Sequence, residues 1–167
     1  MTKEEKIAKL FNLDNKNWMR HANPWSVRTR YSALPLIVIA CWTRVWIGYW
    51  CILPIALSLA WMFLNPVLFS QPKSTNNWES KSVLGERVYA NRNKIAIPQY
   101  HKKAPNILNV IAGVGMMLAL YGVFVLSVWP TVMGVTLAYL GKSWYLDRMA
   151  WLYEDMKKLP EYSAWLY

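Results

Sequence analysis

Histidine and cysteine are scarce in this sequence, which has two of each among its 167 residues. The cysteines, Cys41 and Cys51, form no CxxC pair, and the histidines, His21 and His101, occur in no ExxH, HxxxH or HExxH pattern. Zinc sites draw three or four ligands from closely spaced residues of these types. The sequence therefore argues against a zinc or di-iron catalyst, and we expect no metal and no cofactor.

Motifs for nucleophilic catalysis and for nucleotide phosphate binding are also lacking. There is no G-x-S-x-G sequence, and the stretch Leu84-Gly85-Glu86-Arg87 has a single glycine where a phosphate loop needs more. The first 20 residues contain no apolar segment of signal-peptide length. We therefore expect the first hydrophobic segment itself to direct membrane insertion.

Acidic residues are few, nine against 19 lysines and arginines, so that the formal net charge is +10. The basic residues lie in segments 1–31, 65–106 and 142–167, and the apolar stretches between these segments contain only Arg44. Positive charge collects on the cytoplasmic side of membrane proteins. We expect all three segments, and hence both termini, on the cytoplasmic side of a bacterial inner membrane. Attraction to anionic lipid headgroups accounts for the charge, and we expect no nucleic acid partner.

Long apolar runs dominate what is present. One extends from Ser32 to Leu64, with Thr43 and Arg44 as its only break, and the other extends from Ile107 to Tyr145 with one charge, at Lys142. Each is much longer than the roughly 20 residues that one membrane helix needs. The sequence therefore predicts an all-α membrane protein with four transmembrane helices arranged as two hairpins.

We expect a single membrane domain over residues 1–167, made of four parts. They are an amphipathic inner-surface helix (1–20), the first hairpin (24–64), a cytoplasmic loop containing a short helix (65–106), and the second hairpin, whose last helix continues into the cytoplasm (107–158). Prolines, here often beside an asparagine, are typical of helix ends. They predict a first helix over 24–42, a second ending at Asn65-Pro66, a third beginning after Pro105-Asn106 and a fourth running from Trp129-Pro130 to about Lys158.

Small residues recur four apart in the apolar runs, as the pairs Ala56/Ala60, Gly115/Ala119 and Gly134/Ala138. Such pairs allow membrane helices to approach closely. They are sufficient for a homo-oligomer as well as for packing within one chain. Cys41 and Cys51 flank the tip of the first hairpin, and the sequence leaves open whether they pair.

Polar residues gather in the segments that we expect on the inner face. The candidates for acid–base chemistry are His21, Glu86 and His101. The candidates for binding phosphate or anionic lipid are Arg28, Arg30, Arg87, Arg92 and Arg148. The candidates for lining a headgroup-sized polar pocket are Asn23, Asn65, Asn77, Asn91 and Asp147.

Three of these polar segments carry a resemblance to a known family. HANPWSVRTR at 21–30, NWESKSVLGERV at 77–88 and DRMAWLYEDM at 147–156 resemble an uncharacterised domain-of-unknown-function family of small bacterial integral membrane proteins. The resemblance extends over about residues 20–156 and implies a four-span protein with polar inner-face segments. It implies no reaction, ligand or catalytic residue.

Three hypotheses of function remain open at this point. The first is a non-enzymatic protein that binds anionic lipid or a partner protein through its basic inner face, as a homo-oligomer. The second is a membrane-embedded enzyme acting on a lipid headgroup or amphiphile, which convergence of His101, Glu86 and Arg148 in one cavity would favour. The third, an oligomeric channel or transporter, is weaker because the centres of the predicted spans contain no ionisable residue.

Overall fold

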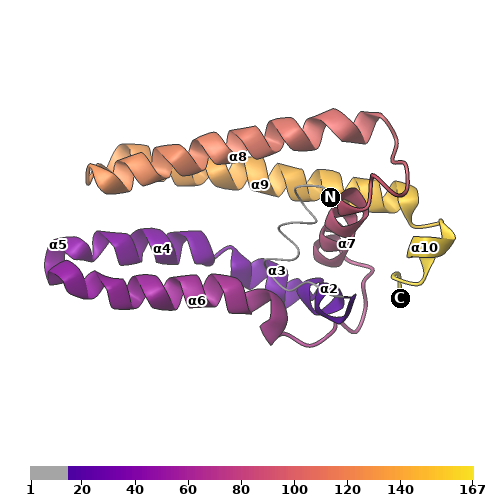
Figure 1. The fold of residues 1–167 in the computed structure, drawn as a ribbon, viewed down its shortest axis with the longest axis horizontal. Coiled ribbons are helices and arrows are strands. Elements are labelled where there is room, and N and C mark those ends of the chain that lie inside the picture. Colours follow the sequence, from indigo (N-terminus) through magenta and orange to yellow (C-terminus); the bar gives the residue numbers. More distant parts are fainter. Residues whose placement is uncertain (1–14) are drawn as a thin grey trace.

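The computed structural model describes residues 15–167, and in this part of the chain all regular secondary structure is helical, without a strand. Its helices form two antiparallel hairpins that start from a common helical base (Figure 1). The first hairpin consists of α4 (Ala33–Trp42), α5 (Arg44–Ile47), η1 (Gly48–Cys51) and α6 (Ile52–Leu68), and the second of α8 (Tyr100–Phe124) and α9 (Val128–Met156). The base consists of α2 (Asn15–His21), α3 (Pro24–Arg30), α7 (Trp78–Ala90), α10 (Pro160–Ser163) and the C-terminal part of α9.

The all-α prediction is confirmed, and part of the chain has membrane-helix character. Among the described residues, the helical stretches Pro24–Leu68 and Tyr100–Phe124 are long and apolar enough to cross a membrane. The first of these turns back on itself at α5 and η1 (Figure 1). Helix α9 is not among the two, because glycine, threonine, tyrosine and tryptophan alternate with its apolar residues. The amphipathic helix expected over 1–20 lies mostly outside the described residues, and only its end coincides with α2.

A turn at Tyr31 and Ser32 divides the helix expected over 24–42 into α3 and α4. Pro35 lies in the first turn of α4 and has no N–H to donate to the carbonyl of Tyr31, four residues earlier. The hydroxyl of Tyr139 on α9 donates a hydrogen bond to that carbonyl instead. The break in the first helix is therefore stabilised by the second hairpin.

Two further helix boundaries differ from the sequence prediction. Helix α6 continues through Asn65 and Pro66 to Leu68, since the buried Asn65 side chain is held against α3. Helix α8 begins at Tyr100, before Pro105, because His101 in its first turn pairs with Asp155 of α9. In both places a tertiary contact extends a helix past a proline. The bounds of α9 agree with the prediction.

Small residues bring α8 and α9 into backbone contact. A Cβ atom added to Gly115 would lie 2.3 Å from the backbone nitrogen of Ala138, and one added to Gly134 would lie 2.2 Å from that of Ala119. Two of the three small-residue pairs therefore pack one helix of the chain on another. Ala56 and Ala60 on α6 are exposed instead.

The hydrophobic core lies in the base, where α7 packs on α9. A Cβ atom on Gly85 of α7 would lie 1.8 Å from the carbonyl oxygen of Met149, so the two backbones touch. Fully buried apolar side chains surround this contact: Val83, Leu84, Val88, Leu152 and Tyr153. The short cytoplasmic-loop helix that the sequence predicts is thus present and docked on α9.

Apart from the base, the two hairpins make few contacts with each other. At the outer tips, Nη2 of Arg44 donates to the carbonyls of Val123 at 2.6 Å and Phe124 at 2.7 Å. These carbonyls belong to the C-terminal end of α8, where a cation interacts favourably with the helix dipole. Arg44, the one charge of the first apolar run, therefore links the first hairpin to the second.

Candidate functional site

Polar side chains from five helices meet where the base joins the two hairpins. We call this group the inter-hairpin cluster. Its members are His21 of α2, Ser26, Thr29 and Arg30 of α3, Asn65 of α6, Glu86 of α7 and Lys142 of α9. The cluster places residues from both ends of the chain and from both hairpins in one region.

Arg30 is the centre of the cluster and is incompletely paired. Its Nη1 is 3.2 Å from Nε2 of His21, its Nη2 is 2.9 Å from Nδ1 of the same ring, and Nη2 also donates to Oγ of Ser26 at 3.1 Å. A neutral imidazole has only one acceptor nitrogen, so one of the two ring contacts is not a hydrogen bond. The Nε of Arg30 is buried and has no partner. No carboxylate of the described residues lies within ion-pair distance of this guanidinium.

His21 is buried beside two cations. Burial, followed by the charges of Arg30 and Lys142, holds the pKa of His21 well below its ordinary value of 6.5. A base whose pKa is lowered in this way is neutral at pH 7. His21 therefore serves as a neutral neighbour of Arg30, and no anion of the described residues balances the guanidinium by direct contact.

The one carboxylate in the cluster pairs with the other cation. Nζ of Lys142 lies 2.7 Å from Oε1 of Glu86 and 4.5 Å from the centre of the Tyr145 ring. The Glu86 carboxylate also acts on the charge of Arg30 without contacting it. With His21 neutral, the cluster has two positive charges and one negative charge, and this surplus favours an anionic ligand.

Asn65 joins α6 to α3 within the cluster. Its Nδ2 donates to Oγ1 of Thr29 at 2.8 Å, and its Oδ1 accepts from Oγ of Ser26 at 3.2 Å. The side chain is fully buried, and both ends of its amide are bonded. Asn65 therefore fixes the position of Ser26, which in turn accepts from Arg30.

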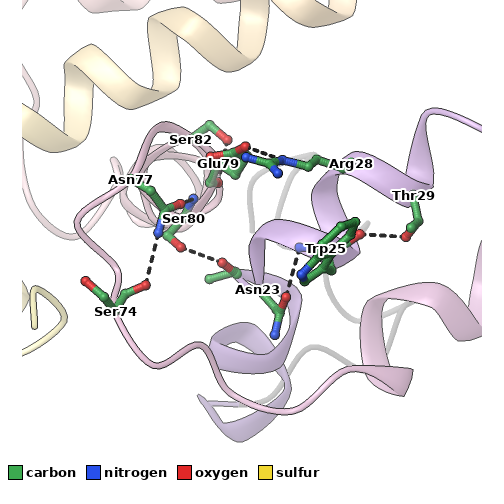
Figure 2. Close-up of polar contacts among 10 residues, drawn as sticks. Asn23, Trp25, Arg28, Thr29, Ser74, Asn77, Glu79, Ser80 and Ser82 are labelled. Carbon is green, nitrogen blue, oxygen red and sulfur yellow. Dashed lines mark hydrogen bonds and ion pairs between the residues drawn. The ribbon is translucent and has the colours of Figure 1, made fainter.

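Two other asparagines from the predicted pocket cap helices beside the cluster (Figure 2). Oδ1 of Asn23 accepts from the backbone nitrogen of Trp25 at 2.9 Å, and Oδ1 of Asn77 accepts from that of Ser80 at 2.8 Å. Ser80 then donates to the carbonyl of Ala22 at 2.7 Å, which joins α7 to the segment between α2 and α3. These asparagines hold the base together, and neither contacts Arg30.

A family assignment follows from comparison with known proteins. The profile of a family of unknown function, DUF6653, matches residues 2–165. The chain belongs to DUF6653. No curated protein and no solved structure matches the sequence. The resemblance to an uncharacterised family that the sequence showed is thereby confirmed.

The remaining predicted site residues of this DUF6653 chain lie apart from Arg30. His101 is buried, with its Nε2 2.7 Å from Oδ2 of Asp155, and Arg148 lies over the Trp151 ring at 4.8 Å. His101, Glu86 and Arg148 therefore make three separate sets of contacts. Other predicted residues are engaged elsewhere: Arg28 with Glu79, Arg87 over Trp165, Arg92 with Tyr89, Asp147 with Trp78, and Asn91 at the end of α7.

Sequence reasoning did not identify Ser26, Thr29 and Lys142 as site residues. Lys142 carried a usable signal, because it is the one charge in the second apolar run. Ser26 and Thr29 carried none, since single hydroxyl residues are common at helix ends. Among residues 15–167, no three histidine, cysteine, aspartate or glutamate side chains come together as metal ligands.

Proposed function

We propose that this protein is a four-span bacterial inner-membrane protein whose inter-hairpin cluster binds the anionic headgroup of a lipid. The observation that carries the proposal is Arg30: its Nε is buried, and within residues 15–167 this Nε has no partner and no carboxylate contacts the guanidinium. Burying an unpaired charge costs free energy unless an opposite charge offsets it. A headgroup phosphate bound at Arg30 would supply that charge.

Side-chain exposure along both hairpins supports their placement in a bilayer. Apolar residues on α6, α8 and the first half of α9 face outward, among them Leu57, Val114 and Met133. The tryptophans at the outer tips, Trp50 and Trp129, are more than three-quarters exposed, as is typical of an aromatic belt at the membrane interface. Such surfaces are costly in water and favourable in lipid.

Exposed tryptophans at the inner ends of the hairpins support a position of the inter-hairpin cluster at the depth of the lipid headgroups. Trp144 lies two residues after Lys142 on α9 and is exposed, and Trp25 lies at the start of α3, also exposed. From Val128 to Trp144, α9 rises about 25 Å, close to the thickness of a bilayer core. Tryptophan at both ends of this length supports a position of Lys142 near the inner headgroups.

The proposal is tested by the substitution Arg30→Gln, with Arg28→Gln as the matched control. Arg28 lies on the same helix, but it is exposed and pairs with Glu79 at 2.6 Å. Native mass spectrometry of the full chain in mild detergent should show retained phosphatidylglycerol on the wild type and on Arg28→Gln, and its loss from Arg30→Gln. Equal retention by all three proteins would overturn the proposal. Circular dichroism melts establish that each variant is folded.

A further inference from the structure

We propose that anion binding at Arg30 is coupled to proton uptake by His21, so that the cluster holds a phosphate headgroup more tightly as the pH falls. The inference rests on the proposed function and adds a regulation of the same site. It follows from how Arg30 and His21 face each other. The coupling applies to any phosphate-like anion. Titrations with a lipid and with a soluble anion distinguish these two kinds of ligand.

In the structure, the His21 ring lies beside the Arg30 guanidinium, where a hydrogen-bond acceptor for Arg30 would lie. Both ring nitrogens lie within 3.2 Å of guanidinium nitrogens, and at most one of them accepts a hydrogen bond. An anion that binds Arg30 would take these N–H groups with its own oxygens. The acceptor nitrogen of His21 would then lose its donor and lie beside a negative charge, which favours its protonation.

Without an anion, protonation of His21 is opposed by two cations of the described residues. Arg30 faces the ring from α3, and Lys142 acts on it from α9. Glu86 of α7 is the acid of the cluster, and it pairs with Lys142. Helix α6 contributes Asn65 and has no ionisable residue, and Arg20 on α2 itself donates to the carbonyl of Phe69. Protonation of His21 is therefore less favourable without the anion than with it.

Coupling of this kind has a defined pH dependence. An anion that raises the pKa of His21 must bind more tightly to the protonated ring, by the reciprocity of linked equilibria. Affinity therefore increases as the pH falls between the pKa of the bound state and the lower pKa of the free state. The increase is at most about tenfold per pH unit for one proton.

The experiment is isothermal titration calorimetry of the full chain in detergent with short-chain phosphatidylglycerol, from about pH 8 to about pH 5, the range in which histidine titrates. This phosphodiester keeps one negative charge throughout, so any pH dependence belongs to the protein. The wild type should bind more tightly at each lower pH, whereas His21→Asn should bind with an affinity that does not change. His101→Asn is the matched control, and it should behave as the wild type does, because His101 pairs with Asp155 outside the cluster.

A second measurement follows the proton directly. In His101→Asn, His21 is the one remaining histidine of the chain, and its ring signals in an NMR titration report a single pKa. That pKa should rise when phosphatidylglycerol is added. An unchanged pKa at saturating lipid, or the same pH-dependent affinity in His21→Asn and the wild type, would overturn the coupling.

The outcomes separate this inference from the function on which it rests. Binding that Arg30→Gln abolishes but that does not depend on pH would leave the headgroup site in place and overturn the coupling. Absence of binding by the wild type at every pH would overturn both. Sodium sulfate, a soluble anion of fixed charge, is titrated in parallel. If sulfate binds with the same pH dependence, the coupling stands and the ligand is a soluble anion; if phosphatidylglycerol alone binds, the ligand is a lipid.

Discussion

The hydroxyl of Tyr139 donates a hydrogen bond to the carbonyl of Tyr31, the carbonyl that Pro35 leaves without a helical donor. The two tyrosine rings stack with their centroids 5.5 Å apart, and the Tyr31 hydroxyl lies 3.0 Å from Oγ of Ser143. A side chain of the second hairpin thus supplies the hydrogen bond that is missing at the helix break in the first. Tyr31 directly follows Arg30 in the chain, so this contact fixes the spacing of the hairpins at the inter-hairpin cluster.

Tyr139→Phe should destabilise the protein by about 1–3 kcal/mol, because it leaves the Tyr31 carbonyl without a partner while keeping the ring stack. Unfolding in mixed detergent, followed by tryptophan fluorescence, measures the loss. Tyr121→Phe is the control, since Tyr121 is exposed on α8. Equal stability of the two variants would show that the carbonyl finds another donor.

Gly85→Ala should detach α7 from α9. Its Cβ atom would lie 1.8 Å from the carbonyl oxygen of Met149, and backbone atoms cannot move aside as a side-chain end can. Overpacking of a core typically costs about 1–3 kcal/mol, and contact with backbone should place this substitution at the upper end or beyond. Limited proteolysis around α7 and thermal melts are the measurements. Gly113→Ala is the control, because a Cβ atom there meets nothing within 4 Å, and a resistant Gly85→Ala would contradict the close packing.

Arg44→Ala should leave membrane insertion unchanged while separating the outer tips of the hairpins. The substitution removes two charged hydrogen bonds to the end of α8, each worth about 1.5–3 kcal/mol where it is shielded from water and less where exposed. Topology reporters at both termini test insertion, and thermal melts test the tip contact. Arg44→Lys should recover part of the stability, since it keeps the charge but not the planar fork. An inverted topology would mean that Arg44 orients the first hairpin.

Without bound anion, the protein should lose stability as the pH falls below about 6.5, the ordinary pKa of histidine. The pKa of His21 is lowered in the folded state, so the unfolded chain takes up the proton first, and acid favours unfolding. The slope is at most about 1.4 kcal/mol per pH unit and ends at the folded-state pKa. Denaturant unfolding at several pH values measures it. His21→Asn should flatten the dependence relative to the wild type and His101→Asn.

Helix α7 of the base could be predicted from the sequence more accurately than the helices of the first hairpin. Val83, Leu84 and Val88 repeat with helical spacing, and α7 lies where that pattern indicates. The prolines at 66 and 105 are local signals of helix ends, yet Asn65 and His101 make tertiary contacts that extend the helices past them. Local signals of helix ends fail where a distant residue supplies the missing interaction.

The candidate site was predictable in four of its seven members and not in its grouping. His21, Arg30, Asn65 and Glu86 were all expected to be functional, but nothing in the sequence indicates that His101 lies elsewhere. Asn23 and Asn77 show a related difficulty, because the residue that caps a helix and the residue that lines a polar pocket are of the same type. The headgroup site, the enzymatic alternative and the oligomeric channel stay predictions.

The contact between Gly85 and Met149 also sets an order for biosynthesis. Helix α7 is synthesised in full before any residue of α9, so its apolar face, with Val83 and Leu84, has no partner on α9 at that time. The second hairpin must be translated in full before Leu152 can cover that face. The protein therefore completes its core with its last long helix, and a ribosome that stalls within α9 leaves an uncovered apolar helix as a substrate for chaperones and proteases.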